Sequence, residues 1–227
     1  SYAMCRIVKE KRKHMGKESV ILPPYYWGVN HCTGSFPGTF SLKPETMRQV
    51  LFEIFENVKD FSFRQVYCFN YHGDSCHVNS IIETIKEVNE KLDLSVKLVV
   101  NAMDLPLYGW RGDENFLLVV DPDYPVEWFE EEEPSEHGLQ DIHAGAFETA
   151  VLHYFCPELV DLETAEQLVS SSLNEEGMEK WLKGGSVIRE AAPLGYAGNP
   201  AGHRAVAKHV AEMLDMQVEN IVSQMRL

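Results

Sequence analysis

The chain has 227 residues, of which 44% are hydrophobic and 24% are charged, a composition typical of a soluble globular protein. Its formal net charge of −15 argues against nucleic acid or an anionic membrane surface as a partner. The sequence has no apolar run near the ~20 residues of a membrane span and no signal-peptide pattern. Five cysteines without regular spacing indicate a reducing compartment, so we expect a cytoplasmic protein.

The first predicted elements are a helix over residues 1–17 and a short apolar strand over residues 18–26 that ends at two prolines. A long polar and aromatic loop follows, from 27 to 40. Loops of this length inside a compact domain are commonly functional. Within it, His31 and Cys32 are either a packed pair or one wall of a substrate pocket.

The next segments predict a βαβ unit. A helix is expected over residues 41–59, with Pro44 in its first turn, and it leads to a strand that ends at Phe69. A second helix runs to Leu92, and a second apolar strand follows over residues 94–100. Two buried strands joined by a helix are typical of an α/β protein with a parallel sheet.

The chain turns sharply between the first strand and the second helix, in the sequence NYHGD. His72 and Asp74 flank Gly73, a spacing that can aim an imidazole and a carboxylate at one divalent cation. Polar groups at the carboxyl end of a strand lie where open α/β sheets hold ligands. The same residues also fit an ordinary strand-to-helix turn with Asp74 or Ser75 as the helix cap, and the pattern alone leaves both readings open.

Residues 106–138 carry scattered aromatic side chains at Trp110, Tyr124 and Trp128. These rings either line a pocket or belong to core packing or a subunit contact. The acidic run over 130–133 is expected to face solvent.

A second informative stretch is LQDIHAGAFETAVLHYFCP, which begins at Leu139. We expect a helix after the Ala-Gly turn, with Glu148 in its first turns. His143 and Glu148 meet only if His143 lies in the preceding loop and points across the helix start. Asp141 also fits a helix cap, and Glu148 also fits a surface carboxylate that offsets the helix dipole.

Short helices are expected over residues 162–170 and 175–182. Asn199 then caps, and Pro200 begins, a long C-terminal helix.

Four motifs occur in a fixed order along the chain: FPGTFSL at 36–42, NYHGD at 70–74, DIHAGAFET at 141–149 and GNP at 198–200. In this order they resemble the creatininase (creatinine amidohydrolase) family, whose members carry FPGT-x-S, GHGGN or GH-x-EN, D-x-HAG-x-x-ETS and GDP. The resemblance covers nearly the whole chain. It implies an α/β fold, a three-layer αβα sandwich with a mostly parallel sheet, in one domain over residues 1–227.

The resemblance also implies a reaction: hydrolysis of a C–N bond in a small cyclic amide or formamide, with one or two divalent metal ions (Zn, Mn or Fe) per chain. It assigns His72, Asp74 and Glu148 to the metal and His143 to acid and base catalysis. It further implies a homo-oligomer, by analogy a hexamer.

Substrate-binding residues are expected at Asn30, Tyr71 and Asp141, with Asn30 standing where the family has a substrate-facing serine. The family's first motif, E-x-HG…TD, supplies three metal ligands and does not occur in this sequence. We therefore expect an N-terminal strand with those ligands to precede Ser1.

Two other functions stay open at this point. The chain can be a catalytically lapsed family member that serves as a binding or structural subunit. A hydrolase with Cys32 or Cys68 as nucleophile is the third possibility.

Overall fold

The computed structural model describes residues 1–128 and 141–225, so the acidic run over 130–133 lies outside the described residues. The described part of the chain forms two compact units. The first comprises Ser1–His31, Phe40–Pro122 and Gln217–Leu227, and the second comprises Cys32–Thr39 and Asp123–Met216. The single domain over residues 1–227 stays a prediction.

The first unit contains a three-stranded parallel sheet in the order β1 (Gln65–Phe69), β2 (Ser95–Asn101) and β3 (Leu117–Val120). Strand β3 and most of β2 are apolar and buried on both faces, as parallel strands in the middle of an α/β protein are, whereas the residues of β1 are only partly buried. Alternate residues point to opposite sides, so Leu98 faces one layer of helices while Val99 faces the other. The predicted parallel sheet of an α/β fold is confirmed.

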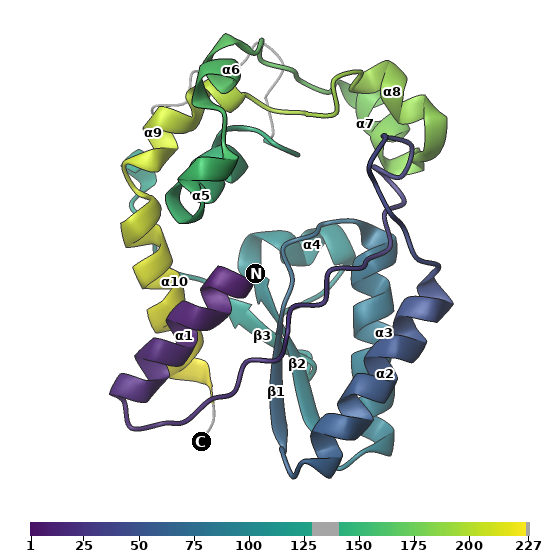
Figure 1. Cartoon of the computed structure of the whole chain (residues 1–227), viewed down its shortest axis with the longest axis vertical. Coiled ribbons are helices and arrows are strands. Elements are labelled where there is room, and N and C mark those ends of the chain that lie inside the picture. Colours follow the sequence, from purple (N-terminus) through teal and green to yellow (C-terminus); the bar gives the residue numbers. More distant parts are fainter. Residues whose placement is uncertain (129–140, 226–227) are drawn as a thin grey trace. The chain divides into compact units, whose positions relative to one another are not determined.

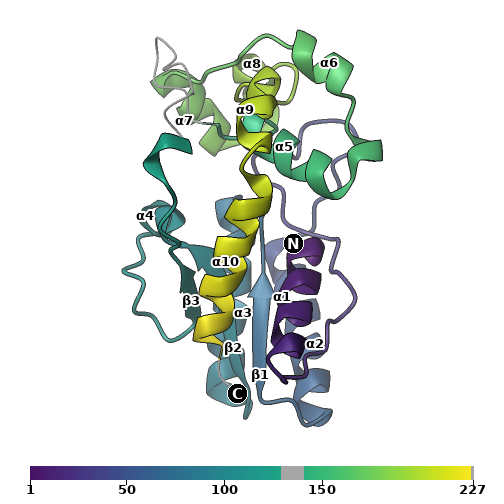
Figure 2. The ribbon, with the colours of Figure 1, turned by 90° about the vertical axis from the view of Figure 1, so that its left-hand side faces the viewer.

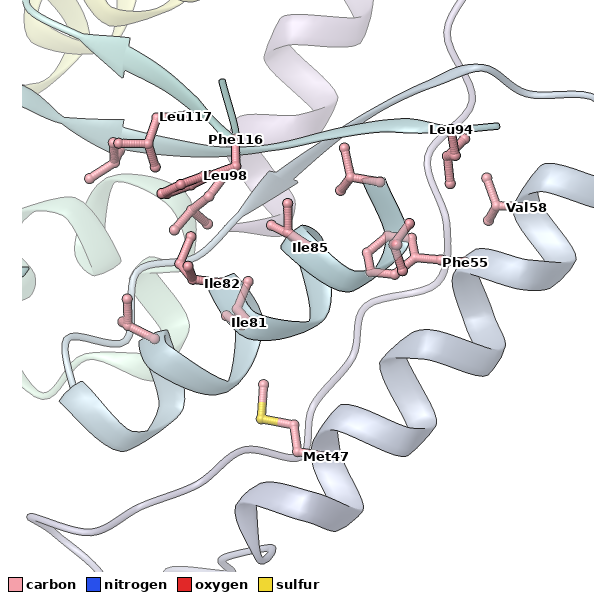
Figure 3. Close-up of a cluster of buried hydrophobic side chains, with 14 of the residues drawn as sticks. Met47, Phe55, Val58, Ile81, Ile82, Ile85, Leu94, Leu98, Phe116 and Leu117 are labelled. Atoms are coloured by element: carbon pink, nitrogen blue, oxygen red, sulfur yellow. The ribbon is translucent and has the colours of Figure 1, made fainter. Parts of the chain in front are cut away.

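One face of this sheet is covered by α2 (Pro44–Asp60) and α3 (Ser75–Lys91), which pack against each other (Figure 1). Figure 3 shows their apolar side chains pointing toward the strands, with Met47 and Phe55 from α2 and Ile81 and Ile85 from α3. Ile85 is fully buried. Their spacing fits the 3.6-residue period on which both helices were predicted.

The opposite face carries α1 (Tyr2–His14) and the C-terminal part of α10 (Val210–Gln224), which lie in front of the strands in Figure 2. The Gln224 side-chain amide donates to the Val119 carbonyl at 2.7 Å, and the Asn220 amide donates to the Asp121 carbonyl at 3.3 Å. Two helical layers around a parallel sheet give the predicted three-layer arrangement within this unit.

The second unit consists of short helices joined by loops. Two isolated bridges, His143 with Ala197 and Ser171 with Gly198, draw its loops together. Its helices are α5 (Ala146–Phe155), α6 (Leu162–Gln167), α7 (Glu175–Lys183), α8 (Ile188–Ala191), α9 (His203–Ala207) and the start of α10. The small helix α4 (Leu105–Tyr108) belongs to the first unit.

Two expectations need correction, and one strand was not predicted. Residues 18–26 form no strand, because Pro23 and Pro24 supply no N–H groups for a ladder. The long C-terminal helix is divided into a 3₁₀ turn at Pro200–Gly202, α9 and α10. Strand β3 was not predicted, although the apolar run FLLVV at 116–120 is typical of a buried strand.

The helices α1, α2, α3, α5, α6 and α7 agree with the sequence-based expectation in type and approximate bounds, whereas the short helices α4 and α8 were not predicted. Within residues 1–128 and 141–225, the helices are too short or too polar for any of them to cross a membrane.

Candidate functional site

The loop after β1 is held by a closed hydrogen-bond network of four residues. The Asn70 side-chain oxygen accepts from the His72 backbone N–H at 3.2 Å and lies 3.2 Å from His77 Nε2. The Val29 N–H donates to His77 Nδ1 at 3.2 Å, and His72 Nε2 lies 3.1 Å from the Val29 carbonyl. The Asn70 side-chain N–H closes the loop by donating to the His72 carbonyl at 2.9 Å.

The backbone groups in this network fix the proton positions on both imidazoles. A backbone N–H can only donate, so His77 Nδ1 accepts from Val29 and its Nε2 carries the proton given to Asn70. A carbonyl can only accept, so His72 Nε2 carries the proton given to Val29. Neutral His72 therefore keeps a lone pair on Nδ1, the atom that can bind a cation.

His77 is almost fully buried, with 7% of its surface exposed. Burial, and then the neighbouring His72 imidazole, lower the pKa of His77 to about 4, so the ring is neutral at physiological pH. The two rings meet edge to face with centroids 4.8 Å apart. A Cβ at Gly28 would lie 2.9 Å from His77 Nδ1, so glycine lets the chain approach this close.

Asp74 is the N-cap of α3. Its side-chain oxygen accepts from the Cys76 N–H at 2.9 Å and the His77 N–H at 3.3 Å, so the predicted cap is confirmed. Its role as a metal ligand stays a prediction. Next to it, the Tyr108 hydroxyl donates to the Gly73 carbonyl at 3.2 Å, and Tyr71 is 48% exposed.

Asn30 connects the two ends of the aromatic loop over residues 27–40 by hydrogen bonds. Its side-chain amide donates to the Phe40 carbonyl at 2.7 Å, and its backbone N–H donates to the Ser41 hydroxyl at 2.9 Å. His31 is exposed, whereas Cys32 packs in the second unit against an apolar cluster that includes Trp181. Of the two readings for this pair, the structure supports packing for Cys32 alone.

In the second unit, Asp141 holds two glycine turns together. It accepts from the Phe147 N–H at 2.8 Å and so satisfies a donor at the start of α5, although the N-cap residue of that helix is Gly145 and not Asp141. A Cβ at Gly145 would lie 1.4 Å from Asp141 Oδ1, and one at Gly198 would lie 2.2 Å from it. Desolvation raises the pKa of the Asp141 carboxyl, and the Phe147 N–H opposes that shift.

His143 lies in the loop before α5 and points across the start of the helix, as the hypothesis required. Its Nδ1 is 3.4 Å from Glu148 Oε2, and the same oxygen accepts from the Ala144 N–H. Ala144 has φ +53°, a left-handed conformation that costs a non-glycine residue about 1 kcal/mol or more. The His143 ring lies 5.7 Å from that of Trp181.

The predicted site residues thus fall into two groups. His72, Asp74, Tyr71 and Asn30 belong to the first unit. The second unit holds Asp141, His143 and Glu148, of which the last two are paired. Among the described residues no group of three His, Cys, Asp or Glu side chains is arranged to hold a metal ion.

The sequence of the chain matches the model of one protein family, described as Creatininase: Creatinine amidohydrolase, over residues 1–225. The chain belongs to the creatininase family. Curated proteins give no match to it.

Solved creatininase structures share the fold. A Glu-to-Gln mutant of the Zn-Zn type has a TM-score of 0.61 at 18% identity, with 98% of this chain and 78% of that chain covered. The structure described as creatininase Mn has a TM-score of 0.54 at 17% identity, with coverage of 98% and 79%. A mutant complexed with creatine gives 0.55 at 18% identity, again with coverage of 98% and 79%. At these identities the comparison shows the creatininase fold and no more.

Other candidates from the sequence are explained by packing. Trp110 stacks on Tyr108 at 4.7 Å and lies against the core of the first unit, and Trp128 stacks on His209 at 4.8 Å. Desolvation raises the pKa of Cys68 to about 12, so it stays a protonated thiol at neutral pH and is a poor nucleophile.

His77 and Asn70 belong to the hydrogen-bond network around His72, and the sequence did not lead us to predict either of them. His77 lies one turn before Ile81 on the buried stripe of α3. A histidine on the buried face of a helix, directly after a loop with a candidate ligand, was the available signal. Asn70 could have been noticed as the first polar residue after β1.

Proposed function

We propose that this member of the creatininase family is a metal-dependent hydrolase that cleaves a C–N bond of a small cyclic amide or formamide. Family membership supports a hydrolase. The observation that carries the metal dependence is the orientation of His72, whose Nε2–H is given to the Val29 carbonyl. Metal-binding histidines commonly donate their second ring N–H to a carbonyl or carboxylate in this way.

The residue types fit Zn²⁺, Mn²⁺ or Fe²⁺. We assign His72 Nδ1 to the metal, with Asp74 and Glu148 as candidate carboxylate ligands. The creatininase structures compared above include a Zn-Zn type and a Mn form, which is in line with this choice. When bound, such an ion lowers the pKa of a water molecule toward about 7 and polarises a carbonyl group.

His143 is proposed to move the proton. With His143 Nδ1 facing the Glu148 carboxylate at 3.4 Å, we assign Nε2 as the ring atom that exchanges a proton with the substrate. Protonation of a leaving nitrogen by a placed histidine contributes about 10²–10⁴ in rate. Asn30, Tyr71 and Asp141 are proposed to contact the substrate.

A second candidate is a catalytically lapsed family member that acts as a binding or structural subunit and has no turnover. The observation in its favour is that the described residues contain no three-ligand cluster. It also fits the hydrogen bonds of Asp74 to the start of α3 and of Asp141 to the start of α5, because each carboxylate already has a structural function. Either function is compatible with the homo-oligomer that we propose. Sedimentation of the purified protein measures its oligomeric state.

The test is metal analysis of purified protein together with turnover on a panel of cyclic amides and formamides. We expect about one or more Zn, Mn or Fe per chain. His72→Ala should remove the metal and the activity, and His143→Ala should keep the metal and lose turnover. His14→Ala, on the exposed end of α1, is the matched control and should change neither.

Metal-free protein that stays inactive after metal loading would favour the lapsed form. Loss of metal in His143→Ala would contradict the division of roles.

A further inference from the structure

Val29 is held from both sides by histidine. Its N–H donates to His77 Nδ1 and its carbonyl accepts from His72 Nε2, so one buried residue connects the two rings. His77 therefore touches the backbone segment that orients His72, although His77 itself has both nitrogens occupied and cannot bind a cation.

We infer that His77 is a positioning residue: it places the Val29 carbonyl so that His72 presents Nδ1, and not Nε2, to a divalent cation. The inference rests on the proposed function for the identity of the ligand. Its structural part, the hydrogen bond from His72 to Val29, can be tested without any ligand.

His77 is suited to this role because it lies on a rigid element. It is the third residue of α3, its backbone N–H donates to the Asp74 cap, and only 7% of the residue's surface is exposed. Val29, by contrast, lies in a loop outside the helices and strands, next to the isolated bridge of Gly28 with Ser41. A hydrogen bond between a loop residue and a side chain on a helix fixes the position of the loop residue relative to the helix.

Asn70 connects His77 to the backbone of His72 and so completes the network. Its side-chain oxygen receives both the His77 ring proton and the His72 backbone N–H. If His77 could rotate, its Nδ1 would lose the Val29 donor. The network thus fixes His72 through two routes, its backbone through Asn70 and its ring through Val29.

The experiment compares two substitutions of His77. Phenylalanine keeps ring volume and removes both hydrogen bonds, whereas glutamine offers one acceptor and one donor at similar separation. A third variant, Gly28→Ala, displaces the ring from the opposite side, since its Cβ would lie 2.9 Å from His77 Nδ1. Ser80→Ala, also buried and one turn along α3, is the matched control.

Two readouts are needed: the ring N–H signal of His72 in ¹⁵N-labelled, chelator-treated protein, and Zn²⁺ affinity by calorimetry. We expect His77→Phe and Gly28→Ala to lose the protected His72 Nε2–H signal and to bind Zn²⁺ about 10–100-fold more weakly. His77→Gln and Ser80→Ala should retain both properties.

An unchanged ring signal or unchanged Zn²⁺ affinity in folded His77→Phe would overturn the inference, as would equal losses in His77→Gln. If His77→Phe does not fold, Gly28→Ala decides by the same criteria. Absence of Zn²⁺ binding by the unsubstituted protein would refute the proposed function instead, and the ring signal alone would then decide whether His77 positions His72.

Discussion

In the first unit, both ring nitrogens of His77 and the Nε2 atom of His72 are hydrogen-bonded. Their partners are the backbone N–H and carbonyl of Val29 and the side-chain amide of Asn70. In the second unit, His143 and Glu148 have side chains that are 42% and 50% exposed, and their one mutual contact is 3.4 Å long. A network built on backbone groups suits a residue that must hold a ligand at a fixed position. An exposed pair suits a residue that must gain and lose a proton.

In the second unit, the Asp141 carboxylate is packed closely between Gly145 and Gly198. Gly198→Ala would bring a Cβ within 2.2 Å of Asp141 Oδ1 and 2.9 Å of the Gly145 backbone. We expect a loss of about 3 kcal/mol in the free energy of unfolding, because such overpacking cannot be relieved by one side chain. Urea unfolding measures it.

The matched control is Gly73→Ala in the first unit, where a Cβ would meet nothing within 4 Å. It should leave stability nearly unchanged. Similar losses in both variants would mean that the clash at Asp141 is not the cause.

The buried network predicts a pH dependence of stability that comes from His77. The pKa of His77 falls from 6.5 to about 4 on folding, so the unfolded chain binds the extra proton between these values. Stability is therefore complete above pH ~6.5 and decreases as the pH falls toward 4, by up to about 3 kcal/mol.

This dependence is measured by denaturant unfolding at a series of pH values in the presence of a chelator. His77→Gln carries no titrating ring and should lose this part of the dependence. The same slope in both proteins would show that another group is responsible.

A smaller effect separates the two roles considered for Asp74. Asp74→Ala removes the cap of α3 and should cost about 0.5–2 kcal/mol of stability, whereas Asp74→Asn keeps a capping oxygen and should cost little. If Asp74 also binds the metal, both variants should bind Zn²⁺ more weakly. Unchanged Zn²⁺ affinity in both variants would leave Asp74 with the cap alone.

The sequence predicted the parallel sheet and most helices, because continuous apolar strands and a 3.6-residue period reflect burial within one element. It also predicted that His143 and Glu148 could meet, since only five residues separate them. The contact from Val29 to His72 and His77 could not be predicted, because it joins residues more than 40 positions apart through backbone groups whose positions no side-chain pattern records.

The strand expected over residues 18–26 shows the opposite error. Its apolar residues satisfied the burial pattern, but the two prolines removed the backbone donors that a ladder needs. Ala144 shows a further limit, since its left-handed conformation is unusual for alanine and becomes visible only in the folded loop.

The central claim is that His72 binds a divalent cation through Nδ1 while Nε2 stays on the Val29 carbonyl. Anomalous diffraction from crystals grown with Zn²⁺ tests it most directly. We predict a zinc peak within coordination distance, about 2.1 Å, of His72 Nδ1. Zinc on Nε2 with the Val29 contact broken, or no zinc at His72 while crystals bind it elsewhere, would contradict the account.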